Sequence, residues 1–208
     1  MRPALPATPL LVITDRLSAP KTLSQIVPDI LQAGCRWLVV REKDLGTTAL
    51  GKLAKEVVDL ARPFDGTVMV NGDVDAAQIA GAAGVHLQSA SQVGPARERL
   101  GDEALIGVST HSFKEAQAAE GAGADYITMS PVFPTDSKPG YGPALGIDAL
   151  AEICRQVALP VVALAGITPA TAASCLNAGA AAVAVMGTVM RSETPGVVVR
   201  ELLQSIGR

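Results

Sequence analysis

The sequence predicts an α/β protein that folds as a single closed (β/α)8 barrel, the TIM-barrel fold. Three observations lead to this prediction: a repeated Ala-Gly pair, eight short apolar runs, and polar residues directly after most of those runs. A glycine just past a helix supplies the left-handed cap from which the chain turns into the next strand. The pair stands between an apolar-periodic segment and a β-type run at four places: Ala33-Gly34, Ala80-Gly81, Ala122-Gly123 and Ala178-Gly179.

The eight apolar runs are continuous rather than alternating, as expected for parallel strands that are covered on both faces. They span residues 10–14, 36–42, 67–71, 84–87, 105–110, 126–132, 161–166 and 182–187. Helical patterns lie between them. In the clearest one, Thr47 or Thr48 is the expected N-cap, and Leu50, Leu53 and Val57 follow at helical spacing. We expect one barrel domain over residues 1–208, with an open doubly wound sheet as the alternative.

The composition excludes several classes of function. The net charge of −3 and the aromatic content of 3% argue against a nucleic-acid-binding protein, which needs a basic surface and stacking rings. No apolar run approaches the roughly 20 residues that span a bilayer. The opening residues do not resemble a signal peptide, so we expect a cytoplasmic protein without membrane contact. The three cysteines lack metal-binding spacing, and we expect no metal site.

Two cations follow the second run. In a TIM barrel the functional side chains lie at the carboxyl ends of the strands. Arg41 and Lys43 are two residues apart, so alternation places them on one face and Glu42 on the other. Neighbouring cations repel unless an anion lies between them, which favours a phosphate or diphosphate clamp. A solvated strand end, with Glu42 as the partner of the cations, is the alternative.

Glycines follow the seventh and eighth runs. Backbone N–H groups near Gly166, Gly187 and Thr188, beside a helix that starts at Thr168-Pro169, would form the phosphate-binding cup that is common in barrels. The same residues also fit an ordinary turn followed by an N-cap and an N1 proline.

A long loop at residues 130–146 follows the sixth run. Thr135, Ser137 and Lys138 in this loop can reach over an anion at the barrel mouth. Its length favours an active-site lid, and a plain surface loop is the alternative.

Eight segments in register resemble the thiamine phosphate synthase and TenI-type thiazole tautomerase superfamily. They are "VITDR", "VVREKDL", "VNGDVDAA", "GVHL", "IGVSTHS", "GADYITMSPVFPTDSK", "LPVVALAGIT" and "AGAAAVAVM". The resemblance implies a barrel that binds a phosphorylated thiazole, with the phosphate on the loops after the seventh and eighth strands. For a synthase it also implies a pyrimidine diphosphate. The residues that match its diphosphate contacts are Arg41, Lys43, Asn71, Ser109 and Lys138, with Thr135 and Ser137 as hydroxyls of the lid.

Several positions depart from the synthase pattern. Gly72 stands where the resemblance implies an Asp that binds Mg²⁺, and Ser91 or a neighbour stands at the second Asp position. Val39 replaces a Gln that contacts the pyrimidine ring. The Asn-Gly pair resembles the tautomerase branch, although Pro131 stands where some tautomerases carry a His.

We therefore expect a metal-independent thiazole tautomerase without cofactor, which shifts a proton to aromatise a carboxythiazole phosphate. His86 and His111 are the candidate acid/base residues, because an imidazole titrates near neutral pH. One alternative is a thiamine phosphate synthase that uses Mg²⁺, and another is a binder of thiazole or thiamine phosphates without catalysis. Barrels of this superfamily are often oligomers, so the resemblance also admits a homo-oligomer.

Overall fold

The computed structural model describes residues 3–135 and 143–207. Parallel strands form a closed barrel in chain order, and the last strand pairs with the first. The strands are β1 (Leu10–Ile13), β2 (Trp37–Val40), β3 (Thr67–Asn71), β4 (Gly84–Leu87), β5 (Leu105–Thr110), β6 (Tyr126–Met129), β7 (Val161–Leu164) and β8 (Ala182–Val185). The TIM-barrel prediction is confirmed, and the open sheet is excluded.

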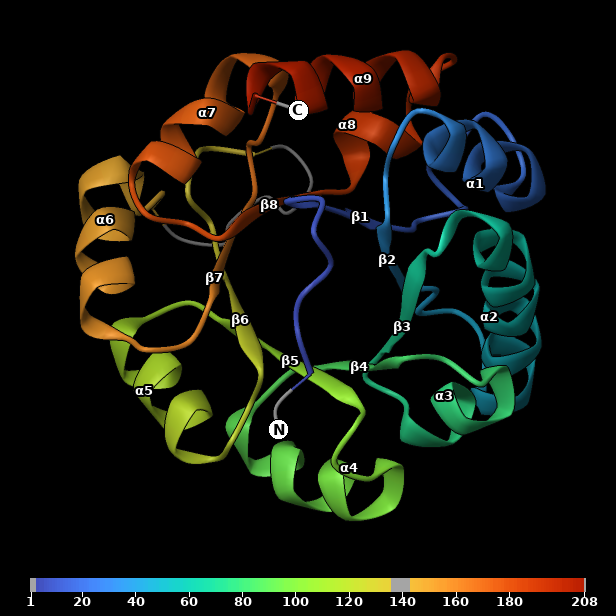
Figure 1. Cartoon of the computed structure of the whole chain (residues 1–208), viewed down its shortest axis with the longest axis horizontal. Coiled ribbons are helices and arrows are strands. Elements are labelled where there is room, and N and C mark those ends of the chain that lie inside the picture. Colours follow the sequence, from blue (N-terminus) through green and yellow to red (C-terminus); the bar gives the residue numbers. More distant parts are fainter. Residues whose placement is uncertain (1–2, 136–142, 208) are drawn as a thin grey trace.

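Helices form a ring around the strands (Figure 1). They are α1 (Leu23–Gln32), α2 (Thr47–Ala61), α3 (Val74–Ala80), α4 (Val93–Leu100), α5 (Phe113–Gly121), α6 (Gly146–Gln156), α7 (Pro169–Asn177), α8 (Gly187–Met190) and α9 (Pro195–Ser205). Short 3-10 turns cover Arg62–Phe64 and Ala90–Gln92. Within the described residues, no helix has the length and apolar character to cross a membrane. The domain boundaries at residues 1 and 208 stay a prediction.

The repeated Ala-Gly pairs work as predicted. Their glycines all have positive φ: Gly34 at 108°, Gly81 at 61°, Gly123 at 86° and Gly179 at 99°. The expected N-cap of α2 is wrong, because Gly46 occupies that position and Thr47 is the first helical residue. The Thr47 hydroxyl instead donates to a carboxylate oxygen of Asp73, at 2.8 Å.

Several expected strands are too long at their carboxyl ends. The run 36–42 contributes only Trp37–Val40 to the sheet, and 126–132 contributes only Tyr126–Met129. The residues after these ends leave the barrel wall and form the loops of the mouth. The position of these loops decides which side chains face the site.

Two apolar layers fill the molecule. One lies between the strands and the helices, and the other fills the barrel interior, where Trp37, Met69 and Tyr126 are fully buried. Leu5 packs against the interior layer, so the segment before β1 covers part of the barrel (Figure 1). Because packed side chains fill the interior, a ligand has access only at the strand ends.

Candidate active site

A pocket lies at the carboxyl ends of the strands. Its lining contains most of the site residues that the sequence predicted: Arg41, Asn71, His86, Ser109, Thr135, Gly166, Gly187 and Thr188. Two others, Ser137 and Lys138, lie outside the described residues. The remaining two, Lys43 and His111, do not line this pocket.

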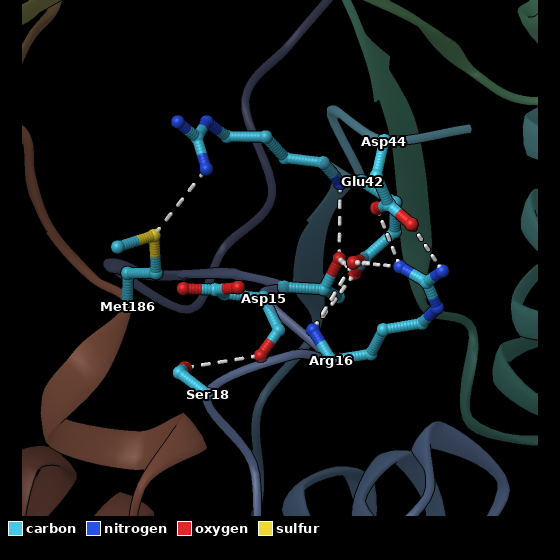
Figure 2. Close-up of polar contacts among 8 residues, drawn as sticks. Asp15, Arg16, Ser18, Glu42, Asp44 and Met186 are labelled. Atoms are coloured by element: carbon cyan, nitrogen blue, oxygen red, sulfur yellow. Dashed lines mark hydrogen bonds and ion pairs between the residues drawn. The ribbon is translucent and has the colours of Figure 1, made fainter. Parts of the chain in front are cut away.

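A buried carboxylate organises the β1–β2 side of the mouth. The Glu42 side chain is only 1% exposed. It accepts hydrogen bonds from Thr14 Oγ1 at 2.6 Å, from the Arg16 backbone N–H at 3.1 and 3.2 Å, and from Arg16 Nη1 at 3.2 Å. Figure 2 shows Glu42 and Asp44 converging on the Arg16 guanidinium. These contacts compensate the desolvation of the carboxylate and fix the loop after β1 to the loop after β2.

The same network orients Arg41. The Arg41 backbone N–H donates to Thr14 Oγ1 at 2.9 Å, and Arg41 Nη1 lies 3.8 Å from Met186 Sδ after β8. The guanidinium therefore reaches across the pocket while Glu42 pairs with Arg16. The Lys43 side chain is exposed, because β2 ends at Val40 and strand alternation no longer applies. Of the two predicted clamp cations, only Arg41 lines the pocket.

His86 forms part of the pocket floor. Its Nδ1 lies 3.0 Å from Tyr126 Oη, and its Nε2 lies 2.9 Å from Ser109 Oγ and 3.3 Å from Thr128 Oγ1. Burial lowers the pKa of His86 to about 4, so the imidazole is neutral at pH 7. Both ring nitrogens are engaged, which leaves neither one free to take a proton from a ligand.

His111 lies outside the pocket, after the end of β5. Its Nδ1 is 2.8 Å from the backbone oxygen of Ser130, and its backbone N–H donates to Glu115 at 2.6 Å. Ser112 is the N-cap of α5, so His111 belongs to the approach to that helix. The acid/base roles expected for the two histidines stay predictions.

Backbone turns after β7 and β8 border the β7–β8 side of the mouth. Gly166 has a φ of 67°, and a Cβ there would lie 2.5 Å from Phe133 Cβ and 2.7 Å from the Pro134 oxygen. Gly187 and Thr188 begin α8, so their N–H groups have no acceptor within that helix. The Thr188 hydroxyl donates to the Ile167 oxygen at 2.9 Å, which joins the two loops.

A helix terminus borders the same side. α7 begins as predicted, with Thr168 as N-cap and Pro169 at the first helical position. Thr168 lines the pocket, as does Ala165, which has a positive φ of 79°. Exposed N–H groups and the positive end of a helix favour an anion, so this side suits a phosphate group.

The positions beside β3 and β4 do not supply a metal site. Asp73 Oδ1 accepts the Ala76 backbone N–H and caps α3, while Oδ2 accepts the Thr47 hydroxyl. Ser91 is hydrogen-bonded to Ser89. Across residues 3–135 and 143–207, no group of three or more His, Cys, Asp or Glu side chains is placed to hold a metal ion. These residues do not fit the carboxylate-bound Mg²⁺ that the resemblance implies for a synthase.

Sequence reasoning missed Tyr126 and Met186. Tyr126 begins the expected strand 126–132, and the sequence analysis gave it no role of its own. A signal was available, because Tyr126 and Thr128 alternate onto the face that carries His86 and Ser109 in the neighbouring strands. Met186 had no such signal, since its contact with Arg41 depends on where the loop after β8 turns.

Comparison with known proteins identifies relatives along nearly the whole chain. The family described as thiamine monophosphate synthase matches residues 10–189. A relative in Geobacter sulfurreducens, provisionally named a thiamine-phosphate synthase, is 42% identical over 93% of this chain and 92% of its own. The thiamine-phosphate synthase of Roseiflexus sp. (strain RS-1) is 38% identical over 92% of this chain and 82% of its own.

A solved structure agrees with these relatives. The thiamine phosphate pyrophosphorylase from Pyrococcus furiosus superposes with a TM-score of 0.85 and 32% identity, over 96% of this chain and 95% of that one. The names of these proteins overturn our expectation of a tautomerase, and assignment as an isomerase is wrong. The Asn71-Gly72 pair was given too much weight against a match that covers the whole barrel. This chain belongs to the thiamine monophosphate synthase family.

Proposed function

We propose that this chain is a thiamine phosphate synthase. It joins a hydroxymethylpyrimidine diphosphate to a thiazole phosphate and releases diphosphate. The observation that carries the proposal is the two-sided pocket, with Arg41, Asn71 and Ser109 on one side and Gly166, Gly187 and Thr188 on the other. Two anion-binding sides suit two phosphorylated substrates. The synthase names of the relatives support the same reaction.

The reaction breaks the bond between the pyrimidine methylene carbon and the diphosphate oxygen. The bonding electrons leave with the diphosphate, and the thiazole nitrogen supplies the pair for the new C–N bond. Negative charge develops on the leaving group, where the Arg41 guanidinium and the Asn71 and Ser109 side chains are placed to stabilise it. No proton has to move in this step. A synthase therefore needs no general base, in agreement with an His86 whose ring nitrogens are both engaged.

The thiazole phosphate is assigned to the β7–β8 side. There the N–H groups near Gly166, Gly187 and Thr188 and the N-terminus of α7 can hold its phosphate. Thr135, Ser137 and Lys138 are assigned to the diphosphate on the basis of the family resemblance alone, and Ser137 and Lys138 lie outside the described residues. The Mg²⁺ requirement is left to experiment, because the described residues do not supply carboxylate ligands. A cytoplasmic location and a homo-oligomer likewise stay predictions.

The test is a coupling assay with the purified chain, the pyrimidine diphosphate and the thiazole phosphate, with and without Mg²⁺. We expect thiamine phosphate and inorganic diphosphate in equal amounts. Arg41→Ala should lower the rate. The matched control is Arg62→Ala. The Arg62 side chain is 73% exposed and forms an ion pair with Asp59 at the surface. Substrate binding without product, with or without Mg²⁺, would contradict the proposal.

A further inference from the structure

A buried polar chain connects Tyr126 to the pocket. Tyr126 on β6 is fully buried, whereas His86 on β4 and Ser109 on β5 both line the pocket. The His86 ring lies between the other two side chains, with Tyr126 Oη 3.0 Å from Nδ1 and Ser109 Oγ 2.9 Å from Nε2. The hydrogen bond between Tyr126 and His86 can therefore determine whether Ser109 donates or accepts a hydrogen bond at a ligand.

The protons in this chain can be assigned by counting acceptors. A neutral imidazole has one N–H and one free lone pair, so its two nitrogens play opposite roles. The Tyr126 hydroxyl has two acceptors within reach, His86 Nδ1 at 3.0 Å and Met69 Sδ at 3.4 Å. A thioether is a weak acceptor, and Met69 Sδ already accepts the Trp37 indole N–H at 3.3 Å. The phenol proton is therefore directed to Nδ1.

We infer that Tyr126 holds His86 in the Nε2–H tautomer, and that His86 in this state makes Ser109 a hydrogen-bond donor to the bound anion. With Nδ1 as acceptor, the imidazole proton lies on Nε2 and is donated to Ser109 Oγ, with Thr128 Oγ1 as a second, longer contact. The Ser109 proton then faces the pocket. A phosphate oxygen offers only lone pairs, so it requires that donor. The opposite tautomer would draw the Ser109 proton toward Nε2 and present lone pairs to the anion.

The surrounding packing fixes the Tyr126 side chain, which lies at the buried end of this row of hydrogen bonds. A Cβ at Gly107 would lie 2.1 Å from Tyr126 Cζ and 2.5 Å from Oη, so the ring occupies space that only glycine leaves. The Trp37 ring meets Tyr126 edge to face, with the centroids 4.9 Å apart. Burial raises the pKa of Tyr126 above its ordinary value, and the phenol keeps its proton. Tyr126 and His86 are thus positioning residues that act through Ser109.

The tautomer assignment stands on these contacts alone, whereas the donor role of Ser109 toward a diphosphate rests on the proposed function. The first measurement is the imidazole spectrum of ¹⁵N-histidine-labelled protein at pH 7. The chain has two histidines, and the His111→Gln variant identifies the signals of His86. We expect a protonated Nε2 and a bare Nδ1. A protonated Nδ1 of His86 in the wild-type protein would overturn the inference, even if the Tyr126 and Ser109 variants failed to fold.

The second measurement is the affinity for inorganic diphosphate. Tyr126→Phe keeps the ring and removes the donor, so the Nε2–H signal should give way to a mixture of tautomers and the affinity should fall about tenfold. In a Ser109→Ala background the same change should have no further effect on affinity. Equal losses in both backgrounds would overturn the inference, since Tyr126 would then act without Ser109. Failure of the proposed function would appear differently, as missing thiamine phosphate from a protein with the expected Nε2–H spectrum.

Discussion

The two sides of the barrel mouth bind anions by different means. On the β1–β2 side, Arg41 lines the pocket, and a network of Thr14, Arg16 and the buried Glu42 fixes the backbone from which the Arg41 side chain extends (Figure 2). On the β7–β8 side, tight backbone turns at Gly166 and Gly187 line the pocket, and the neighbours of Gly166 leave no room for a side chain. A side chain can be shortened without moving the chain, whereas a glycine in a tight turn cannot be enlarged.

Because of this difference, substitutions on the two sides should differ in how far they change ligand affinity and how far they change stability. Substitutions on the β1–β2 side should change ligand affinity more than stability when they touch only a pocket-facing atom. Substitutions on the β7–β8 side should change both, because the turn that holds the N–H groups also packs against Phe133 and Pro134. The chain offers matched pairs of residues that test this contrast.

The largest effect is expected for Gly166→Ala. The positive φ costs about 1 to 2 kcal/mol for alanine, and the contacts of 2.5 and 2.7 Å at the new Cβ add about 1 to 3 kcal/mol of overpacking. We expect the free energy of unfolding to fall by about 3 to 4 kcal/mol in urea titrations, together with loss of thiazole phosphate binding. Gly94→Ala in α4 is the control, since nothing lies near its added Cβ. A Gly166→Ala protein as stable as that control would remove the distinction between the two sides.

His86, in the pocket floor between the two sides, should make the free energy of unfolding depend on pH by about 3 kcal/mol. The pKa of His86 is about 4 in the folded chain, against 6.5 when exposed. The unfolded chain therefore binds more protons between these values, and stability must fall as pH is lowered from 6.5 to 4. The difference between the two pKa values corresponds to a total loss of about 3 kcal/mol in the free energy of unfolding. Unfolding curves at several pH values give the free energy of unfolding as a function of pH, and it should change less with pH in His86→Gln than in the wild-type protein. The same pH dependence in both proteins would place the His86 imidazole in a solvated site.

The barrel itself was predictable from the sequence. Continuous apolar runs and glycine caps such as Gly34 and Gly179 are local signals, and local signals fix the number and order of strands. The ends of the strands were not predictable to the residue. The apolar pattern of 126–132 continues past Met129, although the chain has already left the sheet there.

The lining of the pocket was predictable where the position of a polar residue along its strand decides it. Arg41, Asn71 and Ser109 lie at or directly after the carboxyl ends of β2, β3 and β5, and all three line the pocket. Their binding roles stay predictions. Lys43 was misplaced, because its direction depends on the turn after β2 rather than on strand alternation. The contact of His86 with Tyr126 brings together residues 40 positions apart, which only the barrel closure determines. The reaction class was misjudged from the departures at Gly72, Ser91 and Val39, which identify missing contacts and not a different family.

A third prediction concerns the β1–β2 side. Arg41→Ala removes a guanidinium whose polar side-chain contact among the described residues is with Met186 Sδ. Stability should change by less than about 1 kcal/mol, while loss of a charge-assisted hydrogen bond should weaken diphosphate binding by about 2 kcal/mol. Calorimetric titration with inorganic diphosphate and urea unfolding measure the two quantities. A stability loss as large as that of Gly166→Ala would mean that both sides support the fold equally.

The smallest effect, and the sharpest comparison, is expected for Gly72→Ala after β3. Its φ of 74° is close to the 67° of Gly166, so the two substitutions carry the same backbone strain. The added Cβ at residue 72 would meet only Gln88 Nε2 at 3.6 Å, an ordinary contact. The free energy of unfolding should fall by about 1 to 2 kcal/mol, short of the loss at Gly166. Equal losses at the two glycines would show that backbone strain alone, and not the packing of the Phe133–Pro134 segment, makes the β7–β8 side intolerant of a side chain.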